Sequence, residues 1–562
     1  MTALPPVTAE VAAAALDLLP ARLRKRVDGA VAKAAGWPVE VTPDGVVVRA
    51  AEDTAVTLKV TGTGVVMHAD DAVCSCLLAP ACLHRAAVLS RAPLAEAASE
   101  PPASEPPEPA AVDEEQGPGR IPDQDPSADW PAAAARSLWE AGVAVLAAGV
   151  AGSGAVHRSR LLHASHSARL AGLHRPSATA VRVARRLGEA RGDDPAFRLG
   201  ELVADLAELL ESTRLPNRTA LTPARRSYTP AGPLRLYGLF TEPVVTASGY
   251  AGATTYALAP DGSLRTISDI APGAADRAAQ AANSRVPGGA ALSLRELGDG
   301  GGLILTSPTV SADGRIGGGS EVRSVRAQGA QWHEAPLDTL WEQPPAAQLD
   351  APSGLLFLAG TLTTDGTFAA DGGPTLRLAA PDERLELPYA ENLRLLTARP
   401  GLTLRIIGRV RSEHPGSIAV LAAVWPGPDG VPVRADLGLR RLNRTHLPPL
   451  APVTAVPHPS PAELPVALDL LRRTVDRTVA GGRPVAAWAA ADGDLPHRLR
   501  AAGLTTGADC ARALADAAAD RRHDALGRLL PGDPDAFARA WLAASVYART
   551  ATRSLLTASY RS

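Results

Sequence analysis

Three cysteines and one histidine lie close together near the start of the chain. Cys74, Cys76, Cys82 and His84 fall within eleven residues, in the run VCSCLLAPACLHRAAVL, and the chain has only four cysteines in all. Three thiolates and one imidazole complete a tetrahedral shell around zinc. We therefore predict that these four residues bind one Zn²⁺ ion. A shell of four protein ligands leaves no position for water or substrate, which indicates a structural site.

The spacing of the four ligands predicts the elements that hold them. Cys74 and Cys76 are two residues apart, and on an extended segment such side chains point to the same face. On a helix, side chains two residues apart point in different directions. We therefore expect Cys82 and His84 in the turn that enters a helix, with residues 85–89 continuing that helix. The five residues between the pairs, stiffened by Pro80, are long enough to bring the second pair over the first.

Other interpretations of the cysteines remain open at this point. A disulfide with one spare cysteine would need an oxidising compartment, and the N-terminal residues MTALPPVTAE have no basic region and no apolar core of a signal peptide. Buried cysteines without a ligand, or an iron ion at a cysteine-rich site, are further alternatives. Cys510 stands alone far downstream, and we expect it to be an ordinary buried thiol.

The signature CxC followed by CxH resembles the SWIM zinc finger family, in which it lies on a strand–strand–helix unit. All four ligand positions match, and the apolar flanks at 65–67 and 86–89 fit the strand and the helix. The resemblance covers about residues 40–92. It implies a module for contact with nucleic acid or protein that has no enzymatic activity. Actinobacterial SWIM proteins tend to be encoded beside a MoxR-type AAA ATPase and a von Willebrand A protein, so the resemblance also implies a partner of that kind.

The chain has 562 residues, too many for one hydrophobic core, and its composition changes along its length. We expect an α+β multidomain protein with a small zinc-binding ββα unit, a helical segment, a β-rich region with an OB-like barrel and a C-terminal helical bundle. The predicted segments are a zinc-binding domain at 1–92, an acidic Pro-rich disordered linker at 93–130, a helical domain at 131–227, a β-rich region at 228–448 including the barrel at 350–425, and a C-terminal helical domain at 449–562.

The first and second segments differ in what they can bury. Apolar residues at helical spacing predict helix over 8–35, which Pro20 either divides into two helices or kinks. Valine-rich runs at 46–48 and 56–60 predict two strands. Their core alone would be marginal, and zinc contributes on the order of 10 kcal/mol to modules of this kind. Residues 93–130 carry ten acidic side chains and one basic one with almost no large apolar residue, so this segment cannot bury enough surface to fold.

The most basic part of the chain lies in the expected helical domain. Eight arginines and a single acidic residue occur between His157 and Arg191. Such a concentration of positive charge is typical of surfaces that bind a phosphate backbone. The candidate contacts for DNA or RNA are Arg158, Arg160, Arg182, Arg185 and Arg186.

An alternative is that these arginines pair with acidic side chains of the chain itself. The next predicted helix carries Glu201, Asp205, Glu208 and Glu211 opposite its leucine stripe, and the linker is acidic as well. His163 and His166 could indicate a second metal site. Because no cysteine or carboxylate accompanies them in the sequence, we interpret them as part of a solvated helix face.

The β-rich region shows two patterns. Short runs at 234–240, 254–258 and 264–267 around a Pro-Asp-Gly turn predict hairpins. Five strands, at 355–358, 376–378, 385–387, 402–410 and 418–425, with a helical turn at 391–396, predict the small OB-like barrel. Few aromatic residues are available to stack on bases, mainly Phe357, Tyr389 and Trp425, so a structural barrel is favoured over a nucleic-acid-binding one.

Sequence motifs of common enzymes are missing. The glycine-rich runs at 298–302 and 317–319 lack the Lys-Ser/Thr of a P-loop, and the only three lysines precede residue 60. The sequence contains no HExxH, no GxSxG and no second cysteine near a histidine outside the predicted zinc site. The longest apolar stretch, at 141–156, is shorter than the roughly 18 residues of a membrane span.

These observations lead to one functional expectation and one alternative. We expect a soluble cytoplasmic protein without enzymatic activity that binds Zn²⁺ and acts as an adaptor for protein partners. The alternative is a nucleic-acid-binding protein that uses the finger and the basic helices at 157–191.

Overall fold

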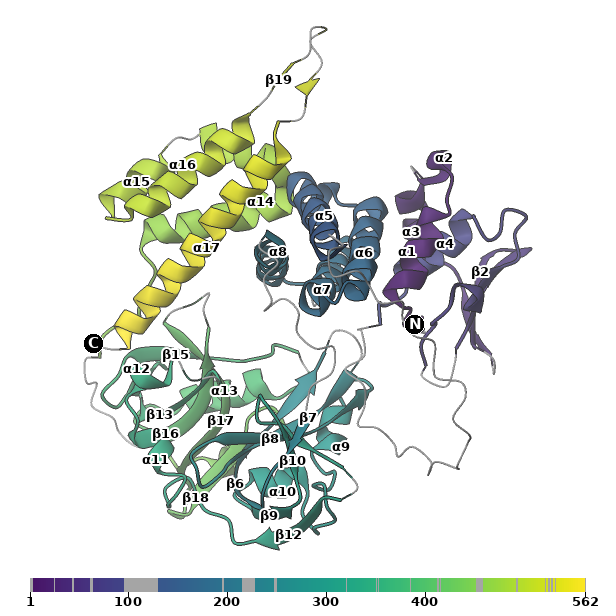
Figure 1. Ribbon diagram of the computed structural model, residues 1–562. Helices are drawn as coiled ribbons and strands as arrows, with labels where there is room; N and C mark the ends of the chain where they lie inside the picture. Colours follow the sequence, from purple (N-terminus) through teal and green to yellow (C-terminus); the bar gives the residue numbers. More distant parts are fainter. Residues whose placement is uncertain are drawn as a thin grey trace. The chain divides into compact units, whose positions relative to one another are not determined.

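The computed structural model shows two compact units. Unit 1 comprises the described parts of Met1–Ser99, Glu108–Arg225 and Pro465–Ala548, and unit 2 those of Arg226–Leu464 and Arg549–Ser562. The protein mixes helices and sheets and ends in helices, which confirms the predicted fold class (Figure 1). The described residues are 4–24, 26–42, 45–60, 64–95, 130–194, 197–214, 228–246, 250–319, 321–349, 351, 353–384, 386–411, 414, 416–450, 458–491, 494–520, 522–523, 526, 529–530 and 532–560.

The N-terminal part of unit 1 is an antiparallel sheet of order β1-β2-β3-β4 covered by helices. Thr8 caps the first helix. Pro20 separates it from the second helix, so of the two expected outcomes, a division or a kink, the structure shows the division. Leu16, Leu19 and Val27 pack with Ala86 in one buried cluster. The elements are α1 (Ala9–Asp17), α2 (Ala21–Arg24), α3 (Val27–Ala34), β1 (Val39–Thr42), β2 (Gly45–Ala51), β3 (Thr54–Lys59), the 3₁₀ turn η1 (Ala69–Asp71), β4 (Ala72–Cys74) and α4 (Leu83–Arg91).

The remainder of unit 1 is helical and comes from two distant parts of the chain. The first set contains α5 (Trp130–Gly152), α6 (Ala155–Leu170), α7 (His174–Arg191) and α8 (Leu199–Arg214), and the second contains α14 (Val466–Ala491), α15 (Leu495–Ala501), α16 (Thr505–Ala519) and α17 (Pro534–Ser559), with the short strands β19 (Arg522–His523) and β20 (Leu529–Leu530) between the last two. The predicted leucine stripe of α8 is buried. The last residues of α17, from Arg549, belong to unit 2.

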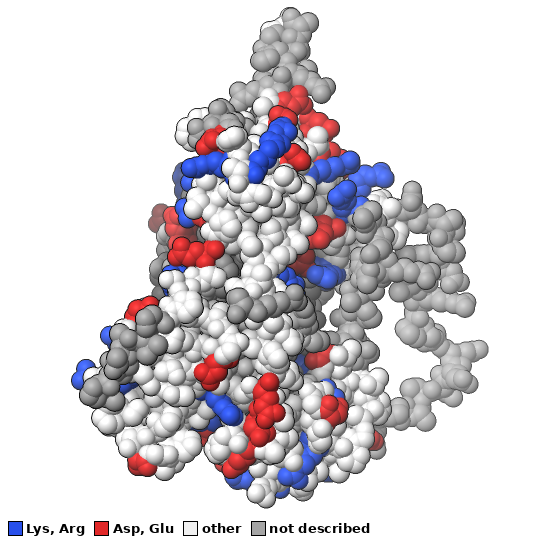
Figure 2. Space-filling view, turned by 90° about the vertical axis from the view of Figure 1, so that its left-hand side faces the viewer, with Lys and Arg blue, Asp and Glu red and all other residues white. Residues whose placement is uncertain are grey.

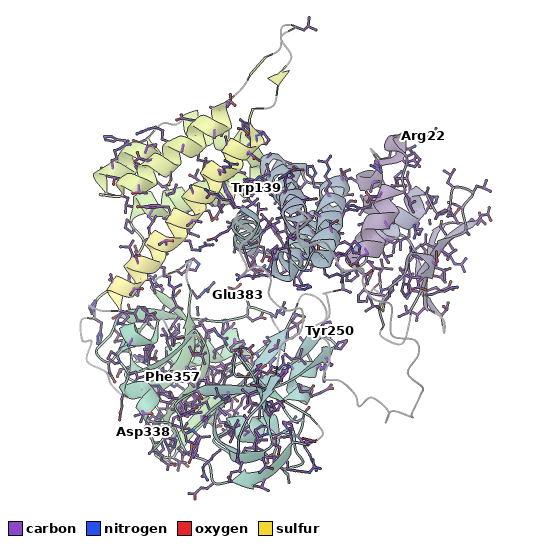
Figure 3. The ribbon with its side chains drawn as sticks, viewed as in Figure 1. Arg22, Trp139, Tyr250, Asp338, Phe357 and Glu383 are labelled. Carbon is purple, nitrogen blue, oxygen red and sulfur yellow. The ribbon has the colours of Figure 1, made fainter. Side chains whose placement is uncertain are left out.

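The two helical sets meet where α5 and α14 cross. Both helices bend at a glycine with positive φ, Gly149 (66°) and Gly482 (72°). A Cβ atom on Gly149 would lie 2.3 Å from the backbone N of Gly482, so only glycine allows this approach. Trp139 of α5 also donates a hydrogen bond from Nε1 to Oδ1 of Asp535 on α17, at 2.8 Å (Figure 3).

Helix α5 is long enough to cross a membrane. Within the described ranges, Pro131–Gly152 is the one helical stretch with the length and composition of a span, and its mean hydropathy is only 1.2. Of its most apolar 18 residues, 56% are buried inside the protein. Because α6, α8 and α14 pack against α5, its apolar side chains contribute to the core of unit 1.

The first half of unit 2 is a five-stranded sheet of order β12-β9-β6-β7-β8 with a smaller sheet of order β11-β10-β5. Leu236, Leu292 and Leu303 are fully buried in its core. Its elements are β5 (Tyr228–Pro230), β6 (Leu234–Val245), β7 (Tyr250–Leu258), β8 (Leu264–Pro272), α9 (Arg277–Ala281), α10 (Leu294–Gly298), β9 (Gly302–Thr306), β10 (Thr309–Ser311), β11 (Ile316–Gly317), β12 (Arg323–Ala327), α11 (Thr339–Glu342) and α12 (Pro345–Gln348).

The second half of unit 2 is the predicted OB-like barrel. Its strands run in the order β15-β14-β13-β16-β17, and a parallel pairing of β15 with β17 closes the ring. Phe368, Ile406 and Trp425 fill the interior. The elements are β13 (Leu355–Leu362), β14 (Phe368–Ala370), β15 (Thr375–Ala379), α13 (Tyr389–Thr397), β16 (Thr403–Val410) and β17 (Ser417–Pro426), followed by β18 (Pro432–Asp436) at the edge and the 3₁₀ turn η3 (Arg444–His446).

One predicted barrel strand is wrong. Residues 385–387 were expected to form a strand, but Glu386 and Leu387 lie in a turn before α13. The second strand of the barrel is instead β14, which has only three residues, Phe368–Ala370. Leu387 is still buried against the barrel core, so its apolar character reflects packing and not strand pairing.

The predicted acidic linker at 93–130 lies outside the described residues except at its two ends. At the first end, the N–H of Val7 donates to the carbonyl of Pro93 and the N–H of Ala95 donates to the carbonyl of Val7, both at 2.8 Å. These bonds hold residues 93–95 beside the start of α1. At the other end, Trp130 begins α5.

Candidate metal centre

The four predicted ligands converge at one point of unit 1. One potential ligand atom from each of Cys74, Cys76, Cys82 and His84 lies within 4.8 Å of the other three. Cys74 ends β4, and Cys82 occupies the N-cap of α4, with His84 in the first turn of that helix. The two pairs therefore come from a strand end and a helix entry, as their spacing predicts. The group could hold one metal ion.

The site fits a tetrahedral metal in two further respects. Zinc–sulfur bonds of about 2.3 Å place neighbouring ligands about 3.8 Å apart, so the observed cluster needs only a small contraction. Nδ1 of His84 is buried and has no hydrogen-bond partner among the described residues. A buried ring nitrogen without a partner is costly, and a metal would satisfy it. The cysteines are free thiols, so the structure gives no support to the disulfide alternative.

The three thiols differ in how readily they lose a proton. Burial raises the pKa of Cys74 to about 12 and also raises the pKa of Cys82. Burial acts in the same direction on Cys76, but hydrogen bonds from the N–H of Leu78 and from the other two thiols lower its pKa. A cation that makes all three sulfurs thiolates must therefore displace protons, and metal affinity should increase with pH.

Backbone contacts fix the loop that carries the first pair of cysteines. The N–H of Ser75 donates to the carbonyl of Ala55 at 3.0 Å, and its Oγ accepts from the N–H of the same residue at 2.9 Å. These bonds extend the pairing of β3 with β4 past Cys74. On the other side, the ring of Trp37 lies 5.9 Å from the ring of His84 and limits its orientation. The sheet therefore positions the first pair of ligands, and the entry of α4 positions the second pair.

Arg85 lies directly behind the site, and sequence reasoning did not identify it. Its side chain is 2% exposed. Nε donates to the carbonyl of Ala72 and one terminal nitrogen donates to that of Ala69, both at 2.7 Å. Nη1 is buried and has no partner in the part of the chain that the structure describes. Burial lowers the pKa of Arg85, and the charges of Cys82, Asp70 and Cys74 oppose that shift. Arg85 thus ties α4 to η1 and brings a positive charge next to the sulfurs.

Acidic residues join the N-terminal module to α6. Oε1 of Glu10 accepts a hydrogen bond from Arg169 and lies 3.4 Å from Nδ1 of His166. Oδ2 of Asp17 lies 3.3 Å from Nδ1 of His163. These contacts explain the two histidines, because each faces a carboxylate of α1 and not a metal.

Two further contacts fix the same junction. Oδ1 of Asp28 on α3 accepts from the N–H of Ala155, the first residue of α6, at 2.9 Å. From the other side, Nη1 of Arg158 donates to the carbonyl of Ser90 on α4 at 3.0 Å. The N-terminal module, residues 4–95, is therefore docked on α6 through several polar contacts, none of which the sequence alone identified.

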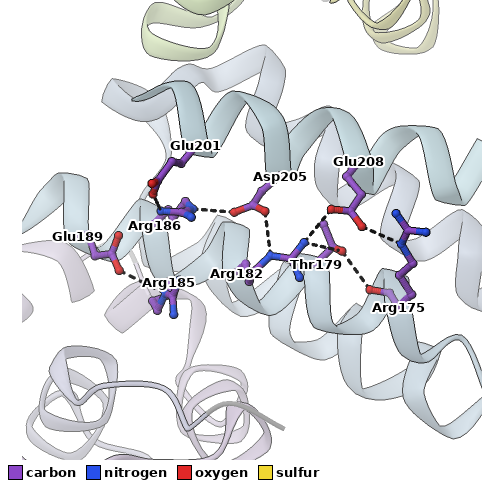
Figure 4. Close-up of polar contacts among 9 residues, drawn as sticks. All are labelled: Arg175, Thr179, Arg182, Arg185, Arg186, Glu189, Glu201, Asp205 and Glu208. Carbon is purple, nitrogen blue, oxygen red and sulfur yellow. Dashed lines mark hydrogen bonds and ion pairs between the residues drawn. The ribbon is translucent and has the colours of Figure 1, made fainter. Parts of the chain in front are cut away.

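Most of the candidate phosphate-binding arginines are engaged inside unit 1 (Figure 4). Arg182 and Arg186 donate through Nε to the two carboxylate oxygens of Asp205 on α8, at 2.8 and 2.6 Å. This is the pairing with the acidic side of the next helix that the sequence left as an alternative. The remaining contacts in this network join Arg182 and Arg175 to Glu208, Arg186 to Glu201 and Arg185 to Glu189.

The other two candidates differ from each other. Arg158 is enclosed by protein, and burial lowers its pKa to about 10. Arg160 is exposed and lies at the edge of a cavity of about 150 Å³ that Leu16, Val27 and Ala155 also line. The structure therefore does not assemble the five arginines into one surface. Cys510, expected to be buried, is half-buried on α16, and burial raises its pKa.

Comparison with known proteins adds no relative to this description. The chain matches no protein-family model, and no curated protein is similar to it.

Proposed function

We propose that this chain is a nonenzymatic zinc-binding protein that acts as an adaptor between protein partners in the cytoplasm. The observation that carries the proposal is the convergence of three thiols and the imidazole of His84 at the junction of a strand and a helix. Three thiolates and one imidazole favour zinc over magnesium or calcium. Four protein ligands fill the shell of the ion, so its role is to hold the finger in shape.

The ligand pattern also supports kinship with SWIM zinc fingers. Cys74, Cys76, Cys82 and His84 match the CxC and CxH pairs at every position, and their strand-and-helix setting is the one the family uses. The proposed kinship rests on this module alone. It makes an AAA ATPase of the MoxR type, or a von Willebrand A protein that works with one, the first partners to test.

Two observations favour protein partners over nucleic acid. Arg182 and Arg186 are already neutralised by Asp205, and a phosphate would have to break those bonds. Arg158 is enclosed by protein and donates to the carbonyl of Ser90, so it is not available to a phosphate either. On the face drawn in Figure 2, which is the side of α15–α17, basic and acidic side chains are interspersed.

The test of the proposal is metal analysis of the purified chain beside Cys82→Ser. The wild type should contain one zinc per chain, and the variant should lose it because a hydroxyl is a poor replacement for a thiolate ligand. Hydrogen exchange should then increase in β3, β4 and α4 and stay unchanged in the barrel, since zinc binding is coupled to folding of such modules.

Cys510→Ser is the matched control, because it removes a thiol from α16, outside the candidate site. It should retain zinc. A wild-type chain that is ordered over residues 64–91 without any metal would contradict the proposal.

Nucleic-acid binding remains the second candidate because Arg160 is exposed beside the finger. If it is correct, the chain should bind duplex DNA or RNA with an affinity that falls steeply with salt, and Arg160→Ala should reduce the slope by about one. Arg182→Ala is the comparison, since its charge is already paired. Absence of binding at low salt would exclude this candidate.

A further inference from the structure

The helices of unit 1 form two copies of one pattern. α5 and α14 each begin a set, and each bends at a glycine with nearly the same backbone angles, φ 66° and ψ 174° at Gly149 and φ 72° and ψ −166° at Gly482. The approach is reciprocal, because a Cβ on Gly482 would lie 2.5 Å from the carbonyl of Ala147. The two sets therefore meet at equivalent points.

The turns that follow the two bends are also alike. Ala171, Gly172 and Leu173 connect α6 to α7, and Ala502, Gly503 and Leu504 connect α15 to α16. The φ of the two glycines is 79° and 76°. Leu173 N–H donates to the carbonyl of Ala168 at 2.8 Å, as Leu504 N–H does to that of Leu499. Because the glycine angles and the leucine hydrogen bonds agree, we take α6 of the first copy to correspond to two pieces of the second copy. These pieces are the end of α14 beyond Gly482 and the short helix α15.

Side chains follow the same correspondence. Residues 166–173 read HSARLAGL and residues 497–504 read HRLRAAGL, with identical residues at five of eight positions. His166 and Arg169 of the first copy therefore correspond to His497 and Arg500 of the second. In the first copy these two residues contact the carboxylate of Glu10, in the first turn of α1.

The finger covers this face in the first copy. Ala155, at the start of α6, is 4% exposed and packs with Leu16 and Val27 of the finger. α1 thus contributes a carboxylate at one end and an apolar stripe along its length. The face of α6 would otherwise present apolar surface to solvent.

Among the described residues of the second copy, the corresponding side chains are exposed. Trp488 is 81% exposed. It follows Gly482 at the same distance in the sequence as Ala155 follows Gly149, so the two residues occupy equivalent positions in the two copies. His497 is exposed, and the side chain of Arg500 is 39% exposed with Asp509 as its partner at 2.8 Å. An ion pair this exposed contributes little and can be exchanged for another carboxylate. Exposed tryptophan and arginine side chains are the residues that most often dominate binding energy at protein interfaces.

We propose that Trp488, His497 and Arg500 form a docking site for a helix of a partner protein. The helix that fits carries a carboxylate in its first turn and small apolar residues along one side, because α1 has this composition and binds the equivalent face of α6. The partner is a different protein, since Glu10 of every copy of this chain is engaged by its own Arg169. The inference rests on the proposed adaptor role and specifies one surface for it.

The test uses a fluorescent peptide of residues 5–19, PPVTAEVAAAALDLL, as the probe for the full-length chain, with anisotropy as the measurement. Trp488→Ala and Arg500→Ala should each weaken binding about ten-fold, and a peptide with Glu10→Gln should bind similarly weakly to the wild type. Arg539→Ala removes an exposed arginine from α17 that pairs with Asp535 and not with Asp509, and it should leave the affinity unchanged. Arg169→Ala should also bind the peptide at the second copy.

Other results would overturn the inference. Equal affinity of the wild type, Trp488→Ala and Arg500→Ala would place the peptide elsewhere, and no binding at millimolar peptide would show that the face does not take such a helix. Self-association that Trp488→Ala abolishes would identify a second copy of the chain as the occupant. The zinc content of the wild type and of Cys82→Ser does not depend on any of these peptide results. Failure of this inference can therefore be told apart from failure of the proposed function.

Discussion

At the scale of single residues, Arg85 is expected to matter for metal binding although it is not a ligand. Three thiolates and one Zn²⁺ carry a net charge of −1, and the guanidinium of Arg85 is buried beside two of the sulfurs. Arg85→Gln removes that charge and loosens η1 from α4. We predict a ten- to hundred-fold loss of zinc affinity, about the effect of removing other outer-shell partners, measured by competition with a chromophoric chelator.

Two variants distinguish the effect of the positive charge of Arg85 from a general loss of stability. Arg85→Lys retains the charge without the fork of hydrogen bonds and should recover part of the affinity. Arg49→Gln removes an exposed arginine that pairs with Glu40 on the same sheet, and it should bind zinc as the wild type does. Unchanged affinity in Arg85→Gln would limit this residue to a packing role.

At the scale of elements, one carboxylate holds α7 against α8. Asp205 is 8% exposed and accepts hydrogen bonds from two arginines. Asp205→Asn would replace the most buried carboxylate of the network by a neutral amide, so that Arg182 keeps only Glu208 and Arg186 only Glu201 as a charged partner. We predict that the free energy of unfolding of unit 1 decreases by about 3 kcal/mol. Denaturant unfolding measures this free energy, and the midpoint of the thermal transition should decrease as well.

The matched control is Glu201→Gln, which removes a carboxylate from the same helix. The side chain of Glu201 is 52% exposed, so its bond with Arg186 is largely screened. A change below about 1 kcal/mol is expected. If the two variants destabilise unit 1 equally, the network acts as a surface charge cluster and not as a buried clamp.

The elements also show what a sequence can predict. Local patterns predicted the cluster of Cys74, Cys76, Cys82 and His84, because the spacing of these residues is a property of neighbouring positions. They failed where structure depends on distant partners. β14 is too short to show alternation and exists because β13 and β15 lie on either side of it. The arginines of α7 looked like a phosphate-binding surface because their partners lie on another helix.

At the scale of the whole molecule, the two helical copies stand on either side of unit 2 in the sequence. Residues up to 214 supply α5–α8 and residues from 466 supply α14–α17, yet all of the first copy and most of the second belong to unit 1. Within unit 2, β6 pairs with β7 and β9 as β13 pairs with β14 and β16. The order of segments along the chain, with helices α5–α8 before the β-rich part and α14–α17 after it, is the one expected if a β-rich segment had been inserted between two copies of a helical one.

An insertion of this kind should be removable. We predict that a chain in which residues 226–464 are replaced by a flexible Gly/Ser linker of about 20 residues, and which ends at residue 548, folds as unit 1 and retains one zinc. Its circular dichroism per residue at 222 nm should be stronger than that of the full chain, because the excised part is mostly β-structure. It should also unfold in one cooperative step, since α14 packs against α5 and α8 across the junction. A variant that keeps zinc but loses cooperative unfolding would mean that the two helical copies depend on unit 2 for their association, and the order of the copies would then reflect one interdependent fold.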